Sequence, residues 1–253
     1  MAEVNDDIEG RVALVTGASR TLGASISVAL AARGVAVAVN YNRSEGSARA
    51  LCAKIGEAGG RAVPIQADVT EPDDLSRLIE ETRAALGPVD ILVNNVGPYV
   101  DTPFADLSTP DFHRVLSGNL RPTFTLSQTL GRAMKERGRG CIVNIAATDA
   151  FHRSHSIYGL VKQAVLHLTE AMALDFAPQV TVNAIAPDLI ADNEDMTDEL
   201  VARAVAATPT GRLITRAEIA EMVCLLCGSP FANVTGQTIV MDGGRSIRRM
   251  VGA

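Results

Sequence analysis

Tyr158 and Lys162 stand four residues apart in a stretch whose pattern predicts a helix. At that spacing two side chains share one face of a helix and lie next to each other. A phenol with a pKa of about 10 is a poor acid or base at neutral pH, and a neighbouring ammonium lowers that pKa by favouring the phenolate. The pair is therefore a candidate for general acid–base catalysis, although the same spacing also occurs by chance on solvated helices.

A glycine-bearing turn near the start of the chain could hold a phosphate. Residues 16–23 read Thr-Gly-Ala-Ser-Arg-Thr-Leu-Gly, between a predicted strand at 12–16 and a predicted helix at 22–33. Gly17 suits a tight strand-to-helix turn, and Gly23 suits close packing of the helix on the strand. The free N–H groups of such a helix N-terminus bind a pyrophosphate. Two glycines alone are weak evidence, but their position between strand and helix predicts a dinucleotide site.

Two later strand ends carry residues of the same kind. Asp68 follows a predicted strand and could accept a hydrogen bond from an adenine amino group, and Asn-Asn-Val-Gly at 94–97 ends the next strand. A small turn of this type lets a backbone approach a ligand closely. Each feature alone could be an ordinary turn, but together and in this order they favour a bound dinucleotide.

Apolar β-branched runs alternate with longer helical patterns along the chain. This alternation predicts an α/β fold, a single-domain doubly wound parallel sheet of Rossmann type over residues 1–253, with seven strands and helices on both faces. The strands are expected at 12–16, 35–40, 62–66, 91–94, 141–146, 180–185 and 238–241, and the helices at 22–33, 44–58, 72–86, 109–137, 156–176 and 216–226.

The segment 188–209 breaks this alternation. It carries six acidic residues and then an Ala/Val-rich helical patch. Because ligands bind beyond the carboxyl ends of strands in such folds, we interpret the segment as a substrate lid. A solvated surface helix is the alternative.

Composition restricts the class of function. The 253-residue chain is 47% hydrophobic with a net charge of −6, which argues against nucleic-acid binding and anionic-membrane binding. Without a signal peptide or a long apolar run, we expect a soluble cytoplasmic protein. Cys224 and Cys227 lie in an apolar run with no second cysteine pair, so we interpret them as core residues and expect no metal site.

These motifs resemble the short-chain dehydrogenase/reductase family, in its 3-oxoacyl-carrier-protein reductase-like branch. The resemblance runs from residue 11 to residue 244. The motifs that carry it are Thr-Gly-x-x-x-x-x-Gly at 16–23, Asn-Asn-x-Gly at 94–97, Asn119, Tyr158 with Lys162, and the final strand with its Asp-Gly-Gly at 236–244.

The resemblance implies a chemistry. The family passes a hydride between a nicotinamide and a carbonyl carbon, so Tyr158 would give the carbonyl oxygen its proton. Lys162 would lower the pKa of Tyr158 and bind the nicotinamide ribose, and Asn119 would hold a water that links Lys162 to solvent. The implied activity is the reduction of a 3-oxoacyl thioester, a polyketide or a similar ketone.

One catalytic residue of the family is missing. Relatives carry a serine just past the fifth strand, about thirteen residues before the tyrosine, where it hydrogen-bonds the substrate oxygen. Counting back from Tyr158 gives Ile145, inside the strand, and alignment on the strand gives Ala147. Thr148 is the nearest hydroxyl, so we expect either that Thr148 substitutes or that nothing does.

The end of the second strand bears on the choice of nicotinamide. Relatives that prefer NAD carry an acidic residue there to hold the ribose hydroxyls. This chain has Tyr41, Asn42, Arg43 and Ser44 instead, and the resemblance points Arg20 at the same place. Guanidiniums without a carboxylate suit a 2′-phosphate, which predicts NADPH as the cofactor. The alternative is that both arginines are ordinary surface charges.

Further departures fall near the nicotinamide. The middle glycine of the phosphate turn is Thr21, and the Pro-Gly and later Thr that usually follow the sixth strand are Pro187-Asp188 and Asp192. A carboxylate there is repulsive unless it turns away. Carried over by position, the cofactor would lie against Gly17, Ser19, Arg20, Thr21, Leu22, Gly23, Tyr41, Asn42, Arg43, Ser44, Asp68, Val69, Asn95, Val96, Gly97, Pro187, Asp188 and Ile190.

Two classes of function remain open. The missing serine and the added carboxylates favour a cofactor-binding regulatory or assembly subunit with weakened or lost reductase activity, whereas Asn119, Tyr158 and Lys162 favour a reductase. The substrate would be a small-molecule or carrier-bound carbonyl compound, and the family suggests a homotetramer (or dimer). Basic residues at 135–139 could meet an acidic carrier protein or could simply complement a helix C-terminus.

Overall fold

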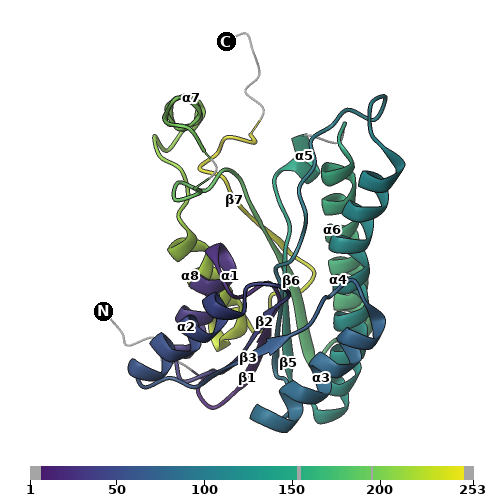
Figure 1. Ribbon diagram of the computed structural model, residues 1–253, viewed down its shortest axis with the longest axis vertical. Helices are drawn as coiled ribbons and strands as arrows, with labels where there is room; N and C mark the ends of the chain where they lie inside the picture. The colour runs from purple at the N-terminus through teal and green to yellow at the C-terminus, as the bar shows by residue number, and fades with distance from the viewer. Residues whose placement is uncertain (1–6, 153–154, 195, 248–253) are drawn as a thin grey trace.

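The computed structural model describes residues 7–152, 155–194 and 196–247. Its strands form one parallel sheet of seven in the order β3-β2-β1-β4-β5-β6-β7, which confirms the predicted α/β fold (Figure 1). The strands are β1 (Val12–Val15), β2 (Ala36–Tyr41), β3 (Ala62–Gln66), β4 (Ile91–Asn94), β5 (Gly140–Ile145), β6 (Val180–Pro187) and β7 (Thr238–Met241).

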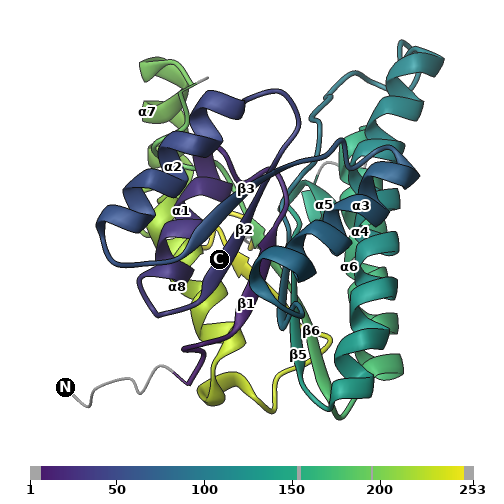
Figure 2. The ribbon, with the colours of Figure 1, turned by 60° about the horizontal axis from the view of Figure 1, so that its bottom comes forward.

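Helices cover both faces of the sheet (Figures 1 and 2). One layer consists of α1 (Thr21–Ala31), α2 (Glu45–Glu57) and α8 (Arg216–Cys227), and the other of α3 (Pro72–Leu86), α4 (Thr109–Arg137) and α6 (Ile157–Phe176). This arrangement explains why the central strands are apolar along their whole length rather than alternating, since neither face meets water.

Successive strand residues supply the two halves of the core. Val15 and Val93 face the layer of α1 and α8, whereas Leu14 and Leu92 face the layer of α4 and α6. Burying each such side chain contributes about 1.5–3 kcal/mol relative to its exposure. Cys224 and Cys227 are buried in the first half as free thiols, as expected of small core residues.

Two short elements lie beyond the carboxyl ends of β5 and β6 (Figure 1). The four-residue helix α5 (Asp149–His152) was not predicted, because one turn is too short to show a periodicity. The helix α7 (Asp198–Ala207) lies within the segment 188–209 and matches its Ala/Val-rich patch. Thr197 caps α7 by accepting a hydrogen bond from the backbone N–H of Leu200. A 3₁₀ turn, η1 (Ser229–Phe231), follows α8.

The basic cluster at 135–139 lies at the other edge of the sheet, where β4 and β5 begin. Arg137 and Arg139 both contact the buried carboxylate of Asp90, and the Lys135 ammonium donates to the carbonyl of Asp175. These contacts are internal and lie at the amino ends of the strands. The arrangement therefore favours the structural interpretation of this cluster over a carrier-protein contact.

Two features are absent from residues 7–152, 155–194 and 196–247. No helix there has the length and apolar character needed to cross a membrane. Nor do those residues contain a group of three His, Cys, Asp or Glu side chains placed to hold a metal ion.

Candidate active site

The β1–α1 turn is built so closely that glycine is required in it. A Cβ atom on Gly23 would lie 2.4 Å from the carbonyl oxygen of Gly17 and 2.8 Å from the amide nitrogen of Asn95. Gly17 itself has a φ of 59°, in the left-handed region that favours glycine. Helix α1 begins here without a side-chain cap, so its first N–H groups stay available to an anion.

Asn40, at the end of β2, holds this turn, and the sequence analysis missed it. Its Oδ1 accepts a hydrogen bond of 3.1 Å from the Gly17 N–H, while its Nδ2 donates at 3.2 Å to the carbonyl of Ala67 after β3. The side chain is fully buried and ties three strand ends together. A lone asparagine inside the apolar run of β2 was the signal that could have revealed it.

Asn95 fastens the turn from the other side. Its Nδ2 donates to the carbonyls of Thr16 at 3.0 Å and Gly17 at 3.3 Å. In return the Thr16 hydroxyl accepts from the backbone N–H groups of Asn95 at 2.9 Å and Val96 at 3.2 Å. The side chain of Asn95 therefore connects the β1–α1 turn to the turn after β4.

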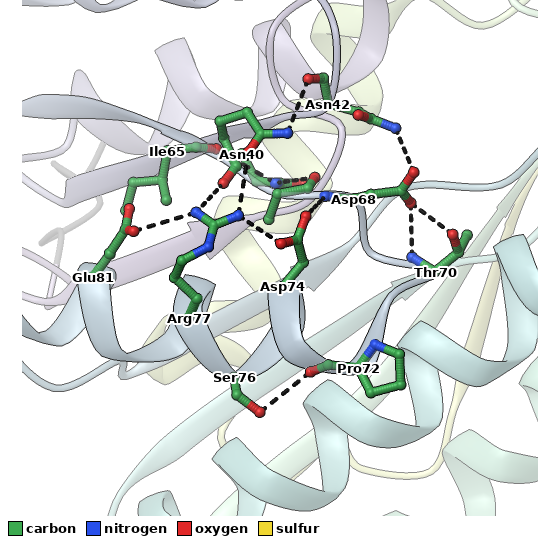
Figure 3. A network of polar contacts seen from close by, with 12 residues as sticks. Asn40, Asn42, Ile65, Asp68, Thr70, Pro72, Asp74, Ser76, Arg77 and Glu81 are labelled. Carbon is green, nitrogen blue, oxygen red and sulfur yellow. Dashed lines mark hydrogen bonds and ion pairs between the residues drawn. The ribbon is translucent and has the colours of Figure 1, made fainter.

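Asp68 belongs to a polar network at the β2–β3 end of the sheet (Figure 3). Its carboxylate accepts hydrogen bonds from the N–H and hydroxyl of Thr70, at 2.9 and 2.7 Å, and from Nδ2 of Asn42, at 2.8 Å. Burial works to raise the pKa of Asp68, but these hydrogen bonds outweigh it and lower the pKa below its ordinary value. Asp68 is thus a fixed, ionised acceptor, with Val69 buried behind it.

The arginines predicted to bind a phosphate lie nearby. Arg20, Thr21, Asn42 and Arg43 are exposed, whereas Tyr41 is buried in the core. Within residues 7–152, 155–194 and 196–247, neither Arg20 nor Arg43 forms an ion pair. Thr21 adopts a φ of 49°, so this non-glycine residue takes a left-handed conformation at the helix start.

Lys162 and Asn119 converge on Gly97, after β4. A Cβ atom on Gly97 would lie 2.1 Å from Oδ1 of Asn119 and 3.1 Å from Nζ of Lys162. Lys162 is buried and donates at 2.9 Å to the carbonyl of Ile145, the last residue of β5. The Nδ2 of Asn119 donates to Pro98, but its buried Oδ1 finds no hydrogen-bond partner among the described residues. An unsatisfied buried acceptor beside an ammonium is a place for a ligand or a water.

Gly118, just before Asn119, serves close packing. A Cβ atom there would lie 2.6 Å from Cδ of Pro98. Helix α4 runs without a break through this position. The glycine lets the 97–98 turn approach α4 closely enough to receive the Asn119 side chain.

Tyr158 lies half-buried on α6, in the same site. The Nζ of Lys162 is 5.4 Å from the centre of its ring, and the Tyr99 ring meets it edge-on with centroids 4.9 Å apart. Burial, with smaller contributions from Asp149 and Tyr99, raises the pKa of Tyr158 well above its ordinary value. In the ligand-free protein the Lys162 ammonium donates to Ile145, so a lowering of this pKa by Lys162 stays a prediction for the cofactor-bound protein.

Burial also changes the protonation of Lys162. It lowers the pKa of the ammonium to about 8, while the charge of Asp149 acts in the opposite direction. Asp149, in the short helix α5, thus raises the pKa of both Tyr158 and Lys162. Asp149 could not be identified from the sequence, because no local pattern places α5 against α6.

Comparisons with known proteins agree with this geometry. A family model described as enoyl-(acyl carrier protein) reductase matches residues 17–246. A 3-oxoacyl-[acyl-carrier-protein] reductase of Synechocystis sp. is 36% identical over 94% of this chain and 97% of its own length. A short-chain dehydrogenase/reductase structure from Serratia marcescens aligns with a TM-score of 0.88 at 33% identity, covering 94% and 99% of the two chains. The chain belongs to the short-chain dehydrogenase/reductase family.

Other relatives differ in what they act on. The hydroxynaphthalene reductase-like protein Arp2 of Metarhizium guizhouense is 34% identical over 96% of this chain and 97% of its own. A 7α-hydroxysteroid dehydrogenase, solved in complex with NADH and 7-oxo glycochenodeoxycholic acid, aligns with a TM-score of 0.89 at 32% identity over 95% and 96% of the two chains. Membership of the family therefore establishes an oxidoreductase fold and leaves the substrate open.

The position of the family's serine is filled by an apolar residue. Ala147 is buried two residues past β5, and the neighbouring Thr148 hydroxyl donates at 3.1 Å to Oδ1 of Asp188. A hydroxyl has one proton to give, so Thr148 cannot donate to a substrate oxygen while this bond lasts. The expectation that Thr148 simply substitutes for the serine is not met in the ligand-free protein.

The second added carboxylate of this short-chain dehydrogenase/reductase turns away from the site. Asp192 accepts a 3.2 Å hydrogen bond from the backbone N–H of Arg216 at the start of α8. Ile190 pairs with Ile214 in a parallel bridge just before it. The base of the 188–209 segment is thereby fastened to α8, which removes the repulsion expected of Asp192.

The residues of this edge fit a dinucleotide. The glycines at 17 and 23 let the β1–α1 turn, Asn95 and the start of α1 pack without intervening side chains, and the uncapped start of α1 offers N–H donors. At the other end, the unsatisfied Asn119 Oδ1 and the Lys162 ammonium both lie against Gly97, a close approach that we call the Gly97 notch. The strand order reverses between β1 and β4, which is where open α/β sheets bind such ligands.

Proposed function

We propose that this protein is an NADPH-dependent carbonyl reductase, with Tyr158 as the proton donor. The observation that carries the proposal is the convergence of Asn119 and Lys162 on the Gly97 notch, with Tyr158 on the same face of α6. A protein that only bound the cofactor would have no use for a half-buried phenol and a buried ammonium at that place. Such buried titratable groups are typical of catalytic sites.

The protonation state of Tyr158 favours reduction. Because its pKa is raised, the phenol carries its proton at neutral pH and can give it to a carbonyl oxygen. NADPH, when bound, supplies the hydride that goes to the carbonyl carbon. The proton from Tyr158 then completes the alcohol, and the phenolate left behind is stabilised by the nearby Lys162 ammonium.

Lys162 and Asn119 are proposed to return the proton to Tyr158. The Asn119 Oδ1 is a buried acceptor without a partner in the described part of the chain, and it lies on the side of Gly97 that the Lys162 ammonium also approaches. A water bound between them would satisfy both groups and connect the ammonium toward solvent. Lys162 would also hold the nicotinamide ribose through its remaining N–H groups.

NADPH is proposed over NADH because of charge at the end of β2. Arg20 and Arg43 are exposed there, with no carboxylate partner among the described residues, and Tyr41 stands where NAD-preferring relatives carry an acid. Free guanidiniums bind a phosphate dianion well. In a calorimetric titration NADPH should bind at least tenfold more tightly than NADH, and the Arg20→Ala/Arg43→Ala protein should lose that difference. Equal affinity of the wild type for both would refute the preference.

The substrate is proposed to be a 3-oxoacyl thioester, a polyketide or a similar ketone, free or carrier-bound. Tyr99, more than half exposed, and His155, within 4.0 Å of the Asp101 carboxylate, line the rim in front of Tyr158. This rim offers both an aromatic face and polar groups. The reductases named among the relatives support an acyl or polycyclic ketone.

A homotetramer (or dimer) is proposed on the evidence of exposed apolar side chains on α4 and α6. Phe124 on α4, with Leu160 and Leu174 on α6, are exposed, and a groove on α4 is lined by Leu116, Leu120 and Phe124. Contiguous apolar surface of this kind marks an interface. Light scattering should give a mass of two or four chains, and a monomer would contradict the proposal.

The other candidate is a cofactor-binding protein without reductase activity. It is favoured by the buried Ala147 at the serine's position and by the neighbouring Thr148 hydroxyl, which already donates to Asp188. NADPH oxidation over a panel of ketones and acyl thioesters separates the two candidates. Activity that disappears in Tyr158→Phe, with NADPH affinity unchanged, supports the reductase. Identical rates for the two proteins would support the non-catalytic alternative.

A further inference from the structure

Asp188 carries an ion pair that a reductase with glycine at this position would not need. Its Oδ1 accepts from the Thr148 hydroxyl at 3.1 Å, and its Oδ2 lies 3.1 Å from Nη1 of Arg245. Nη1 makes no aligned hydrogen bond in the described part of the chain, so its contact with Asp188 is Coulombic rather than directional. Both side chains are about three-quarters buried, where charges are screened less than at the surface.

Arg245 lies in a turn after β7 that hydrogen bonds to the Asp242 carboxylate hold in place. The Asp242 carboxylate accepts backbone hydrogen bonds from Gly244 at 2.9 Å and Ser246 at 2.5 Å, which wraps the chain around it. Gly243, with a φ of 63°, packs so closely that a Cβ there would lie 2.4 Å from Oγ1 of Thr210. The turn therefore places the Arg245 side chain beside Asp188, at the end of β6. The same turn packs against Thr208, near the end of the 188–209 segment.

Asp188 borders the nicotinamide end of the proposed site. It directly follows β6, and its partner Thr148 follows the neighbouring β5, whose last residue accepts the Lys162 hydrogen bond. An uncompensated carboxylate at this place would act on the nicotinamide ring. It would attract the oxidised ring, which is cationic, and would have no such effect on the neutral reduced ring.

We propose that Arg245 is a positioning residue that neutralises Asp188 and so keeps the site from favouring oxidised over reduced nicotinamide. This inference rests on the proposed function. It adds that the Asp188–Arg245 pair helps to set the direction of the reaction by balancing the affinities for oxidised and reduced cofactor. A protein that releases the oxidised cofactor after each turnover works faster when that cofactor is not held by an extra negative charge. The ion pair supplies that neutrality while leaving the Asp188–Thr148 hydrogen bond intact.

The test is the ratio of NADP⁺ affinity to NADPH affinity, measured by calorimetric titration of the full chain. Arg245→Gln should shift the ratio toward NADP⁺ by about tenfold, because it exposes the Asp188 charge. Asp188→Asn should shift it the other way, because the Arg245 charge is then uncompensated. The double variant should return to within about threefold of the wild type, and Arg245→Lys should keep most of the wild-type ratio.

Arg33→Gln is the matched control, since Arg33 is a similarly buried arginine that also pairs with a carboxylate, that of Glu221, past the C-terminal end of α1. It should leave the ratio unchanged. A purely structural ion pair would change melting temperature without moving the ratio, so a ratio within twofold of wild type in both Arg245→Gln and Asp188→Asn overturns the inference. If the wild type binds neither cofactor, the proposed function itself fails, and the inference fails with it.

Discussion

The two ends of the cofactor edge are built in different ways. Around the β1–α1 turn, backbone groups are fixed by neutral side chains, as Asn40 and Asn95 hold Gly17. At the β5–β6 end, charged groups are brought in and then compensated, as Arg245 compensates Asp188 and Arg216 compensates Asp192. Both ends depart from the family's pattern, the first at Thr21 in the phosphate turn and the second at Asp188 and Asp192. The two ends therefore differ in the groups that fix them, which are neutral amides around Gly17 and paired charges beyond β5 and β6.

The largest effect should come from filling the notch between the two ends. Gly97→Ala places a Cβ within 2.1 Å of Asn119 Oδ1, so either the turn or the asparagine must move. Displacement of this kind should lower kcat/KM for carbonyl reduction by about 10²-fold or more. Gly46→Ala is the control, because a Cβ there meets nothing within 4 Å. Wild-type kinetics in Gly97→Ala would show that the close packing of Asn119 and Lys162 against Gly97 is not needed for reduction.

A smaller effect should follow from loosening the neutral end. Asn40→Ala leaves the Gly17 N–H without its acceptor, which should weaken NADPH binding by about tenfold and lower stability by about 1–3 kcal/mol. Asn183→Ala is the matched control, since Asn183 is an equally buried asparagine that braces β6 against the loop before β7. It should lower stability to a similar degree without changing the dissociation constant for NADPH. Equal weakening of binding by both would show that Asn40 has no special role in the turn.

The charged groups beyond β5 should determine how kcat/KM for reduction depends on pH. Lys162, with a pKa of about 8, loses its proton as the pH rises through that value, so kcat/KM for reduction should fall above about pH 8. Asp149 raises this pKa, and Asp149→Asn should therefore move the fall to lower pH. Tyr158 stays protonated in both proteins because burial is the main cause of its raised pKa. A fall that moves to higher pH in Asp149→Asn would contradict this assignment.

The smallest effect should come from Thr148. Its proton is already given to Asp188, so Thr148→Ala should change kcat/KM by less than about threefold. Loss of a true oxyanion donor would instead cost about 10²–10³-fold. A loss of that size would show that Thr148 leaves Asp188 when substrate binds and acts as the serine's substitute.

Sequence reasoning was strongest where the signals are local. The buried strands and the glycines that punctuate them predicted the fold, and most element ends agree within two residues, as for β3, β4, α3 and α4. Motif spacing also named Asn119, Tyr158 and Lys162, which the structure brings to one notch. These signals work because each depends on residues close in sequence or on a motif read as a unit.

The rest depends on contacts between residues far apart in sequence. Thr148 and Asp188 are 40 residues apart, and Arg245 follows the last strand, so no local pattern indicates that the three meet. The raised pKa of Tyr158 likewise arises from burial and from Asp149 on a separate helix. The motif alone led us to expect that Lys162 has the largest effect on the pKa of Tyr158. It could not show that the Lys162 ammonium donates a hydrogen bond to the carbonyl of Ile145.

The most direct test of the account is the rate of NADPH oxidation by wild type and Tyr158→Phe with a 3-oxoacyl thioester, alongside NADPH affinity for both. We expect Tyr158→Phe to lose about 10²–10⁴-fold in kcat while binding NADPH within about twofold of the wild type, because it lacks the proton and keeps the cofactor cradle. Equal turnover by the two proteins, or no turnover by either over the ketone panel, would contradict the claim that Tyr158 is the proton donor of a carbonyl reductase.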